Sequence, residues 1–281
     1  MSRKYALIGD KLGHTLSPPI HKRLFELRGR EFEYELLEIA PQELEQRAQY
    51  LSTLAGYNVT IPHKPAIISF LDGLDKSAQR YGAVNCVDNK NGVSTGYNTD
   101  CDGFLRSIAA GGGKLGGSVL LLGAGGVGRM MAVEASLAGA DLTIAVPESF
   151  AGQANKVKED ILAQKSDAAV NIVTLEKIPL KHYDTMINAT PVGMYPKCDA
   201  CVVSDEVISC AGFVFDAIYN PKETLLIQKA KAMGKTAVGG MAMLVLQAVS
   251  AHEIWDGDSY TDDEINAIIS EMYQRVESDF K

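Results

Sequence analysis

The amino-acid sequence predicts an α/β fold with two domains: a small N-terminal α/β domain and a second domain built on a doubly wound parallel sheet. Short aliphatic and β-branched runs alternate with helical patterns along most of the chain, as in successive βα units. A glycine-rich segment at residues 109–117 interrupts this alternation, which favours a linker there. Beyond it the alternation is regular, as expected for parallel strands covered by helices on both faces.

Composition and charge limit the possible partners. The 281 residues suit one large or two medium domains. A hydrophobic content of 46% and a charged content of 22% are typical of a globular protein with a core. The formal charge of −8 argues against nucleic acid or an anionic membrane surface as the main partner. Small molecules are therefore the expected partners, and the sequence leaves both a monomer and a homodimer open.

We also expect no targeting peptide, no membrane span and no metal site. Met1 to Lys4 lead directly into a strand-like run, without the apolar region of a signal peptide. No apolar run reaches the roughly 20 residues that span a bilayer, so we expect a cytoplasmic protein. Five cysteines, an odd number, favour reduced thiols over a disulfide framework. Cys198 and Cys201 have a spacing seen in metal sites, but no second pair follows.

The first hundred residues are predicted to alternate strands and helices. Strands are expected at 4–9, 32–39 and 57–61, where aliphatic, aromatic and β-branched residues gather. Helices are expected to begin at Ser17, ahead of two prolines, and at Pro41, where proline occupies the first turn.

A further helix is expected over residues 65–72, followed by a hairpin of strands 83–87 and 93–97 around the turn residues 88–92. Lys64 lies at the start of that helix, where a cation opposes the positive end of the helix dipole. This unfavourable position favours a functional reason for the lysine.

Residues 118–146 carry a nucleotide-binding signal. The buried run 118–122 ends in Gly123-Ala-Gly-Gly-Val-Gly128, and a helix over 127–138 then leads to a strand over 141–146. In such a motif the first glycine makes a tight turn, the second lets a pyrophosphate reach the backbone and the third lets the helix pack on the strand. The strand–turn–helix context makes the motif informative, although a turn that needs glycine only for sterics remains the alternative. The cofactor-binding residues predicted here are Gly123, Ala124, Gly125, Gly126, Val127 and Gly128.

The remaining alternation completes a Rossmann-type doubly wound sheet. Two helices are expected after Met241. The further strands are predicted at 171–175, 184–188, 213–216 and 235–238.

Lys64 and Asp100 form a candidate catalytic pair. Each follows the end of a strand in the same small domain, so the two side chains are expected to reach one cleft. An ammonium beside a carboxylate can relay a proton to a carbonyl or hydroxyl group. The alternative is that Thr99 or Asp100 only caps a helix.

Several motifs, in order and over nearly the whole chain, resemble those of the shikimate dehydrogenase family. They are His14-Thr-Leu-Ser-Pro18, Asn58-Val-Thr-Ile-Pro-His-Lys64, Gly82-Ala-Val-Asn85, Gly96-Tyr-Asn-Thr-Asp100, Gly123-Ala-Gly-Gly-Val-Gly128, Asn188-Ala-Thr-Pro191, Tyr219-Asn-Pro221 and Gly240-Met-Ala-Met-Leu-Val-Leu-Gln247.

The resemblance implies an enzyme that reduces the ketone of 3-dehydroshikimate to shikimate with a nicotinamide cofactor, by family default NADP. Residues 1–108 and 241–281 would form the substrate-binding catalytic domain, to which the C-terminal helices return, and 109–240 the dinucleotide-binding domain. Lys64 and Asp100 take the places of the catalytic pair. The implied substrate-binding residues are Thr15, Ser17, Asn58, Thr60, Asn85, Tyr219 and Gln247. The further implied cofactor-binding residues are Asn188, Ala189, Thr190 and Gly240.

These residue types suit the implied substrate, because a polyhydroxylated carboxylate needs hydroxyls and amides rather than apolar walls. Structural roles remain open for some of them. Ser17 is also placed to cap a helix, Asn58 and Asn85 to satisfy strand ends, and Tyr219 to fill a core.

Departures from the family pattern leave substrate range and cofactor choice open. Thr15 stands where serine is common, and Met241 and Ala242 replace a leucine and a glycine. The segment 143–150 lacks the usual Asn-Arg-Thr run. Glu148 has about the spacing of an acid that binds the ribose of NAD.

The nearest cations to Glu148 along the following helix are Lys156 and Lys158. The local sequence therefore favours NAD or weak discrimination against the family default. Alternatives to a shikimate dehydrogenase are a relative that accepts quinate, a non-catalytic dinucleotide-binding sensor, and another lysine-dependent Rossmann enzyme such as a methylenetetrahydrofolate dehydrogenase.

Overall fold

A computed structural model describes residues 3–13 and 15–279. His14 of the first motif therefore lies outside the described residues. Contacts between Cα atoms divide the chain into two compact units. Unit 1 comprises Met1–Gly103 and Val245–Met272, and unit 2 comprises Phe104–Leu244 and Tyr273–Lys281. The domain limits expected from the sequence stay a prediction.

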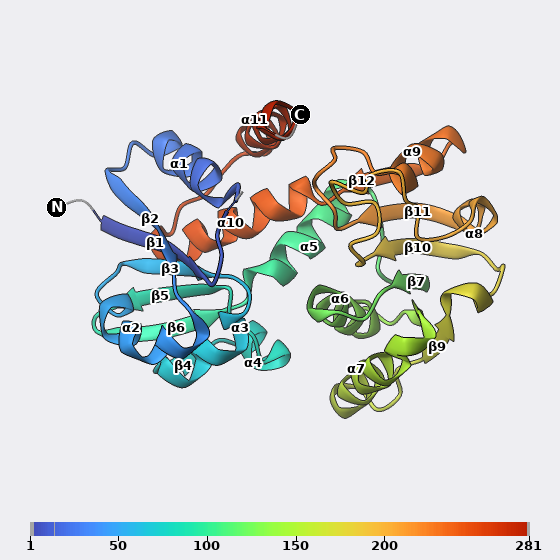
Figure 1. Cartoon of the computed structure of the whole chain (residues 1–281), viewed down its shortest axis with the longest axis horizontal. Coiled ribbons are helices and arrows are strands. Elements are labelled where there is room, and N and C mark those ends of the chain that lie inside the picture. Colours follow the sequence, from blue (N-terminus) through green and yellow to red (C-terminus); the bar gives the residue numbers. More distant parts are fainter. Residues whose placement is uncertain (1–2, 14, 280–281) are drawn as a thin grey trace. The chain divides into compact units, whose positions relative to one another are not determined.

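Unit 2 contains the regular alternation expected after the glycine-rich segment (Figure 1). Its elements are β7 (Ser118–Leu122), α6 (Gly126–Leu137), β8 (Asp141–Val146), η3 (Glu148–Phe150), α7 (Ala151–Gln164), β9 (Val170–Thr174), η4 (Leu175–Lys177), β10 (Tyr183–Asn188), α8 (Asp205–Ser209), β11 (Ala211–Asp216), α9 (Leu225–Ala232) and β12 (Thr236–Gly239).

The sheet of unit 2 has the strand order β12-β11-β10-β7-β8-β9, and every pair in it is parallel. Renumbered from β7, this is the 3-2-1-4-5-6 order of the Rossmann fold. The order reverses between β7 and β10, where ligands bind outside the carboxyl ends of the strands in such sheets. The predicted doubly wound parallel sheet is confirmed.

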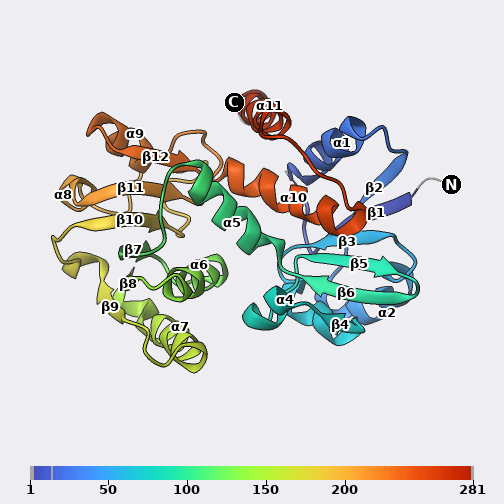
Figure 2. The ribbon, with the colours of Figure 1, turned by 180° about the vertical axis from the view of Figure 1, so that it is seen from behind.

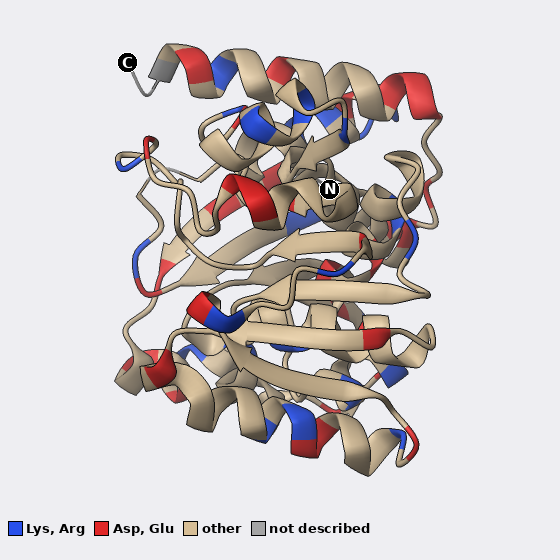
Figure 3. Ribbon diagram, turned by 90° about the vertical axis from the view of Figure 1, so that its right-hand side faces the viewer, with Lys and Arg blue, Asp and Glu red and all other residues tan. Residues whose placement is uncertain are grey.

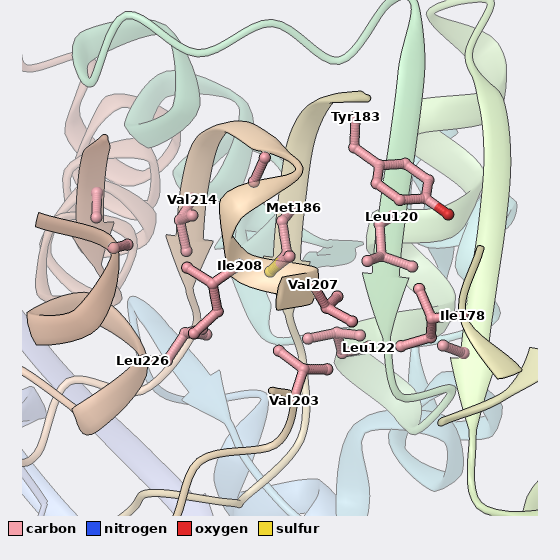
Figure 4. Packing of buried hydrophobic residues seen from close by; sticks show 14 of the residues in the cluster. Leu120, Leu122, Ile178, Tyr183, Met186, Val203, Val207, Ile208, Val214 and Leu226 are labelled. Atoms are coloured by element: carbon pink, nitrogen blue, oxygen red, sulfur yellow. The ribbon is translucent and has the colours of Figure 1, made fainter. Parts of the chain in front are cut away.

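The core of unit 2 explains the aliphatic run of β7 and the apolar residues in the middle of its neighbours. Strands buried on both faces cannot alternate polar and apolar residues. Leu120, Leu122, Met186 and Val214 are at most 2% exposed. Figure 4 shows them directed into one cluster with Ile208.

Unit 1 has a mixed sheet with the strand order β2-β1-β3-β5-β6-β4 (Figure 2). Its elements are β1 (Arg3–Gly9), α1 (Ser17–Leu27), β2 (Phe32–Glu38), η1 (Pro41–Glu43), α2 (Leu44–Leu51), β3 (Gly56–Val59), α3 (His63–Ala66), η2 (Ile67–Phe70), β4 (Gly73–Leu74), α4 (Lys76–Tyr81), β5 (Cys86–Lys90) and β6 (Val93–Tyr97). Three helices contain residues of both units or lead between them: α5 (Thr99–Ala110), α10 (Met241–Asp256) and α11 (Asp262–Asp279).

The hairpin of unit 1 has a shorter turn than predicted. The turn was expected over residues 88–92, but β5 continues to Lys90 and only Asn91 and Gly92 form the turn. Both have a positive φ, of 55° and 76°. Asn-Gly is the preferred pair for such two-residue turns because both residues adopt this conformation at low cost.

The segment around Lys64 also differs. The strand was expected to reach Ile61 but ends at Val59, and the helix expected from Pro65 is one turn of α-helix over His63–Ala66 followed by a 3-10 turn. A four-residue helix has few aligned peptides, so its dipole is small. The dipole at Lys64 is therefore less unfavourable than the sequence indicated, and the case for a functional lysine depends on its partners.

Gly56 provides a test of packing in unit 1. A Cβ atom added at Gly56 would lie 2.3 Å from Nε1 of Trp255, which donates a hydrogen bond to the carbonyl of Val87 at 2.8 Å. We expect Gly56→Ala to lower the free energy of unfolding by about 2–4 kcal/mol, because the buried indole must move. Gly73→Ala, in another strand and with no atom within 4 Å of the added Cβ, is the matched control. Equal midpoints of denaturant unfolding for the two variants would contradict this account.

Charge and hydropathy agree with the composition. Acidic and basic residues are interspersed over the described ribbon, and the strands are mostly uncharged (Figure 3). Within residues 3–13 and 15–279, no helix is long and apolar enough to cross a membrane.

Candidate active site

Lys64 and Asp100 form an ion pair in unit 1. The Lys64 Nζ atom lies 2.6 Å from Asp100 Oδ2, and the two side chains are 25% and 19% exposed. Lys64 belongs to α3 and Asp100 to the first turn of α5. The predicted proximity of the two residues is confirmed. A half-buried ammonium held by a carboxylate, yet open to solvent on one side, can exchange a proton with a bound ligand.

Asn85 holds the other oxygen of Asp100. Its Nδ2 atom donates to Asp100 Oδ1 at 2.9 Å, and its Oδ1 atom accepts from the backbone N–H of Thr99 at 2.6 Å. Gln247 Oε1 lies 3.4 Å from the same Nδ2 atom. Asn85 is only 3% exposed. The start of α5 and the carboxylate of Asp100 are therefore oriented by one buried amide, a positioning role that the sequence did not indicate.

Asn58 lies on β3 with a partner that the sequence also did not indicate. The hydroxyl of Tyr34 on β2 donates to Asn58 Oδ1 at 2.8 Å. Asn58 Nδ2 lies 3.5 Å from the carbonyl of Asn85. Tyr34 resembles any strand aromatic in the sequence, and only the pairing of β2, β1 and β3 brings it to Asn58.

The hydroxyl residues near the start of α1 are half-buried. Thr15 Oγ1 accepts from the backbone N–H of Ser17 at 3.2 Å. The N-cap position of α1 is Leu16, without a side-chain cap, so the Ser17 hydroxyl is not used as a helix cap. Thr60 is half-buried just beyond β3.

His63 is a further positioning residue next to the ion pair. It is 1% exposed, and its Nε2 atom donates to the carbonyl of Ile39 at 2.7 Å. This bond ties the turn that carries Lys64 to the chain just beyond β2. His63 belongs to the motif Asn58–Lys64, but the sequence indicated neither its burial nor its partner, which is 24 residues away.

The glycine turn of unit 2 has the geometry that a dinucleotide requires. Gly123 has a φ of 97°, and a Cβ atom added at Gly128 would lie 2.7 Å from the Gly123 carbonyl oxygen. Gly125 and Gly126 are exposed, with no atom within 4 Å of an added Cβ. Gly123 thus makes the tight turn and Gly128 the close helix packing, while the approach to the N-terminus of α6 is open. Backbone N–H groups there suit a pyrophosphate. Ala124 is buried and Val127 is exposed beside this approach.

A hydrogen bond between Asn188 and Asp216 links the carboxyl ends of β10 and β11, on the other side of the switch point from β7. Asn188 Nδ2 donates to Asp216 Oδ1 at 3.0 Å, and Asn188 Oδ1 accepts from the Thr190 hydroxyl at 2.7 Å. Asp216 also accepts from Thr224 Oγ1 at 2.6 Å and from the Ile218 N–H at 3.1 Å. Asn188 is fully buried, so its side chain holds the loop of Ala189 and Thr190 rather than facing solvent.

The loop after β11 contains Tyr219 and contacts Gly240, which follows β12. A Cβ atom added at Gly240 would lie 2.1 Å from the Ala217 carbonyl oxygen, so only glycine allows this approach. The Gly240 N–H donates to the Ile218 carbonyl at 2.9 Å. Tyr219 follows, and burial raises the pKa of its hydroxyl.

Asp216 predicts a pH effect on stability. Burial raises the pKa of Asp216 to about 6, against hydrogen bonds from Thr224, Ile218 and Asn188 that lower it. Since an unfolded aspartate titrates near about 4, the native state binds the extra proton between these values. Its stabilising contribution is complete below about pH 4 and is lost as the pH rises through about 6.

We therefore expect the free energy of unfolding of the natural chain, relative to Asp216→Asn, to increase by about 2–3 kcal/mol from pH 7 to pH 4. The variant cannot titrate at this position and serves as the reference. Denaturant unfolding at several pH values measures the difference, and a constant difference would contradict the raised pKa.

The edge of unit 2 beyond β8 carries the residues relevant to the cofactor ribose. Glu148, Ser149 and Phe150 form η3 and are exposed. On α7, Lys156 is exposed and Lys158 is half-buried. Arg129, which follows the glycine turn, donates to Asp160 at 2.7 Å.

A Rossmann sheet with an open glycine turn, and a lysine–aspartate pair on a second α/β unit, define a dinucleotide-dependent oxidoreductase as the class of this protein. Comparisons with known proteins narrow the class. A family model described as the shikimate dehydrogenase substrate binding domain matches residues 7–87. Together with the curated relatives described next, which are more than 30% identical over most of the chain, this match shows that the chain belongs to the shikimate dehydrogenase family.

Two curated relatives and one solved structure illustrate the similarity. A shikimate dehydrogenase (NADP(+)) of Caldanaerobacter subterraneus subsp. tengcongensis is 34% identical, with 93% of this chain and 94% of the relative covered. One of Shouchella clausii is 38% identical, with 92% and 94% covered. The crystal structure of shikimate 5-dehydrogenase from Listeria monocytogenes in complex with shikimate and NAD is 30% identical, covers 95% of this chain and 96% of that chain, and has a TM-score of 0.87.

Proposed function

We propose that the chain catalyses the reversible, nicotinamide-dependent reduction of 3-dehydroshikimate to shikimate, as its family membership suggests. The observation that supports this most directly is the chain of contacts from Lys64 through Asp100 to Asn85, with distances of 2.6 and 2.9 Å. In this arrangement Lys64 is the proton donor, and it is held in place by Asp100. The other carboxylate oxygen of Asp100 is bound by Asn85. Ketone reduction needs one such donor next to the carbonyl oxygen.

In this reaction a bound nicotinamide would supply the hydride for the carbonyl carbon. Lys64 gives a proton to the carbonyl oxygen, which becomes the new hydroxyl, and takes it back in the oxidation direction. Asp100 holds the ammonium in place and balances its charge. Asn58, Asn85 and Gln247 offer amides to substrate hydroxyls, while Thr15 and Ser17 offer hydroxyls to the carboxylate. Thr60 and Tyr219 are proposed to complete the substrate contacts.

The cofactor is proposed to bind at the glycine turn. Open space at Gly125 and Gly126 fits a pyrophosphate on the N-terminus of α6. Gly123, Ala124, Val127 and Gly128 form that turn. Ala189 and Thr190, in the loop held by Asn188, and Gly240, after β12, are the further proposed contacts.

We further propose that the chain uses NAD at least as well as NADP. Exposed Glu148 follows β8, where an acid favours the free ribose of NAD. A 2′-phosphate beside this acid, without a cation, would cost about 1–3 kcal/mol. NADP(+)-named relatives and a structure in complex with NAD both belong to this family. The cofactor preference is therefore expected to depend on residues near the ribose rather than on the fold.

The test is steady-state kinetics with shikimate and quinate, each against both cofactors. We expect kcat/KM with NAD to equal or exceed that with NADP. Glu148→Gln should raise kcat/KM with NADP about 3- to 10-fold by removing the repulsion, while Glu159→Gln, an exposed acid on α7, should not. A preference of about tenfold for NADP in the natural chain would contradict the proposal and indicate Lys156, Lys158 or Ser149 as the phosphate site.

Quinate oxidation is the second candidate activity. Quinate carries an additional hydroxyl, and Thr15 in place of serine changes the space near the substrate carboxylate. A higher kcat/KM with quinate than with shikimate would favour this reading. Reduced-cofactor binding without turnover of either acid would instead favour a non-catalytic sensor.

A further inference from the structure

We propose that Tyr34 is a positioning residue for substrate binding: its hydroxyl fixes the orientation of the Asn58 amide, so that Asn58 presents an N–H donor to the substrate. The proposal rests on the proposed function, in which Asn58 contacts a substrate hydroxyl. Tyr34 itself reaches the substrate only through Asn58.

The two neighbours of Asn58 determine which way its amide faces. The Asn85 carbonyl, 3.5 Å from Asn58 Nδ2, can only accept a hydrogen bond. The amide nitrogen must therefore face this carbonyl, and Asn58 Oδ1 must face Tyr34. Across the 2.8 Å that separate the Tyr34 hydroxyl from Oδ1, the tyrosine is the donor. Burial raises the pKa of Tyr34 well above its usual value, so the hydroxyl keeps its proton at working pH.

This orientation leaves a donor for the ligand. Asn58 Oδ1 is occupied by Tyr34, and one of the two Nδ2 hydrogens faces Asn85. The second Nδ2 hydrogen remains for an acceptor outside these contacts. The bond from Tyr34, at 2.8 Å, is the shorter of the two contacts that hold this orientation, and the contact with the Asn85 carbonyl, at 3.5 Å, is weak. Without the Tyr34 hydroxyl only the weak contact opposes a rotation of the amide by half a turn, which would present its oxygen instead. A substrate hydroxyl placed to accept would then lose its donor.

The ring of Tyr34 is held by a second buried group. It stacks on His21 of α1, with ring centroids 4.6 Å apart and an angle of 16° between the planes. His21 Nδ1 in turn lies 3.1 Å from Nε2 of His252 on α10. Both histidines are fully buried, and burial lowers their pKa values, so the pair is neutral.

The carbonyl of Leu24 determines which nitrogens of His21 and His252 carry protons. The Tyr260 hydroxyl lies 3.2 Å from the Leu24 carbonyl, to which it can only donate. It therefore accepts from His252 Nδ1 at 3.1 Å. His252 Nε2 is then the acceptor, and His21 Nδ1 the donor. His21 cannot turn its ring without breaking this bond, so the face on which Tyr34 rests is fixed.

The experiment is Tyr34→Phe, which removes one oxygen and keeps the ring stack. We expect KM for shikimate to rise about 5- to 20-fold, the loss of about one hydrogen bond to the substrate, with kcat changed less than about twofold and KM for the cofactor unchanged. Tyr57→Phe is the matched control. Tyr57 is the neighbour of Asn58 on β3, 2% exposed, and its side chain points to the opposite face of the strand.

A double-mutant cycle separates orientation from general destabilisation. In an Asn58→Ala background, Tyr34→Phe should have no further effect on KM, because there is no amide left to orient. An equal rise of KM in both backgrounds, or the same change for Tyr57→Phe, would overturn the proposal. If Tyr34→Phe is less stable, the same cycle is measured by calorimetric binding of shikimate at a temperature at which all its variants are folded. A loss of affinity only in the presence of Asn58 still supports the orienting role. Failure of the natural chain to turn over shikimate would instead count against the proposed function.

Discussion

Lys64→Ala is expected to lower kcat by about 10²–10⁴-fold, the range for loss of a positioned acid or base. Shikimate should bind nearly as well, because Lys64 acts on the reacting oxygen rather than on the carboxylate end. Stability should change little, since the ion pair is partly exposed, at 25% and 19%. Steady-state kinetics and calorimetric binding measure the two effects separately.

Lys64→Arg is the matched control for this prediction. An arginine keeps the positive charge beside Asp100 but does not release its proton at working pH. Activity near that of the natural chain in Lys64→Arg would show that only the charge matters. A raised KM with unchanged kcat in Lys64→Ala would show that the lysine only binds.

The two members of the pair are expected to act as a unit. Asp100→Asn should also lower kcat, because the ammonium loses its anchor 2.6 Å away. The double variant should cost much less than the sum of the two single losses. Additive losses would mean that the residues contribute independently.

Asn85→Asp is the second change for which a large effect is expected. The substitution keeps the acceptor for the Thr99 N–H but replaces the donor that lies 2.9 Å from Asp100 Oδ1 by a carboxylate oxygen. Two carboxylates at this separation repel each other and compete for Lys64. We expect kcat to fall about 10²-fold near neutral pH, with partial recovery at lower pH, where one carboxyl group is protonated.

A pH profile of kcat tests this expectation. Asn266→Asp, the same exchange at an exposed position of α11, should leave the profile unchanged. A profile for Asn85→Asp that is parallel to that of the natural chain would show that Asn85 does not control the charge of the pair.

Hydrophobic patterning was a sound guide to the fold. Strand Asp141–Val146 has the predicted bounds, and the helix after the glycine turn begins within one residue of its prediction. Buried parallel strands are continuous aliphatic runs, and a glycine turn leaves its own spacing in the sequence. These signals are local, so a single sequence contains them.

Predictions failed where tertiary contacts compete with local preference. The strand before Lys64 stops at Val59, and the following helix is reduced to one turn. There His63 is held by the Ile39 carbonyl, and Ile67 is fully buried. Packing of these two side chains outweighs the small free energy of continuing a helix.

The sequence by itself determined the class of fold, the glycine turn and the residue types of the site, because each depends on neighbours in the chain. Only the tertiary structure decided which polar atoms meet. Lys64 and Asp100 are separated by 36 residues, and Asn85 and Gln247 by 162. Tyr34 reaches Asn58, and Asp216 reaches Asn188. A hydrogen bond depends on distance and direction in space, which strand pairing and burial set, and residue spacing carries no record of either.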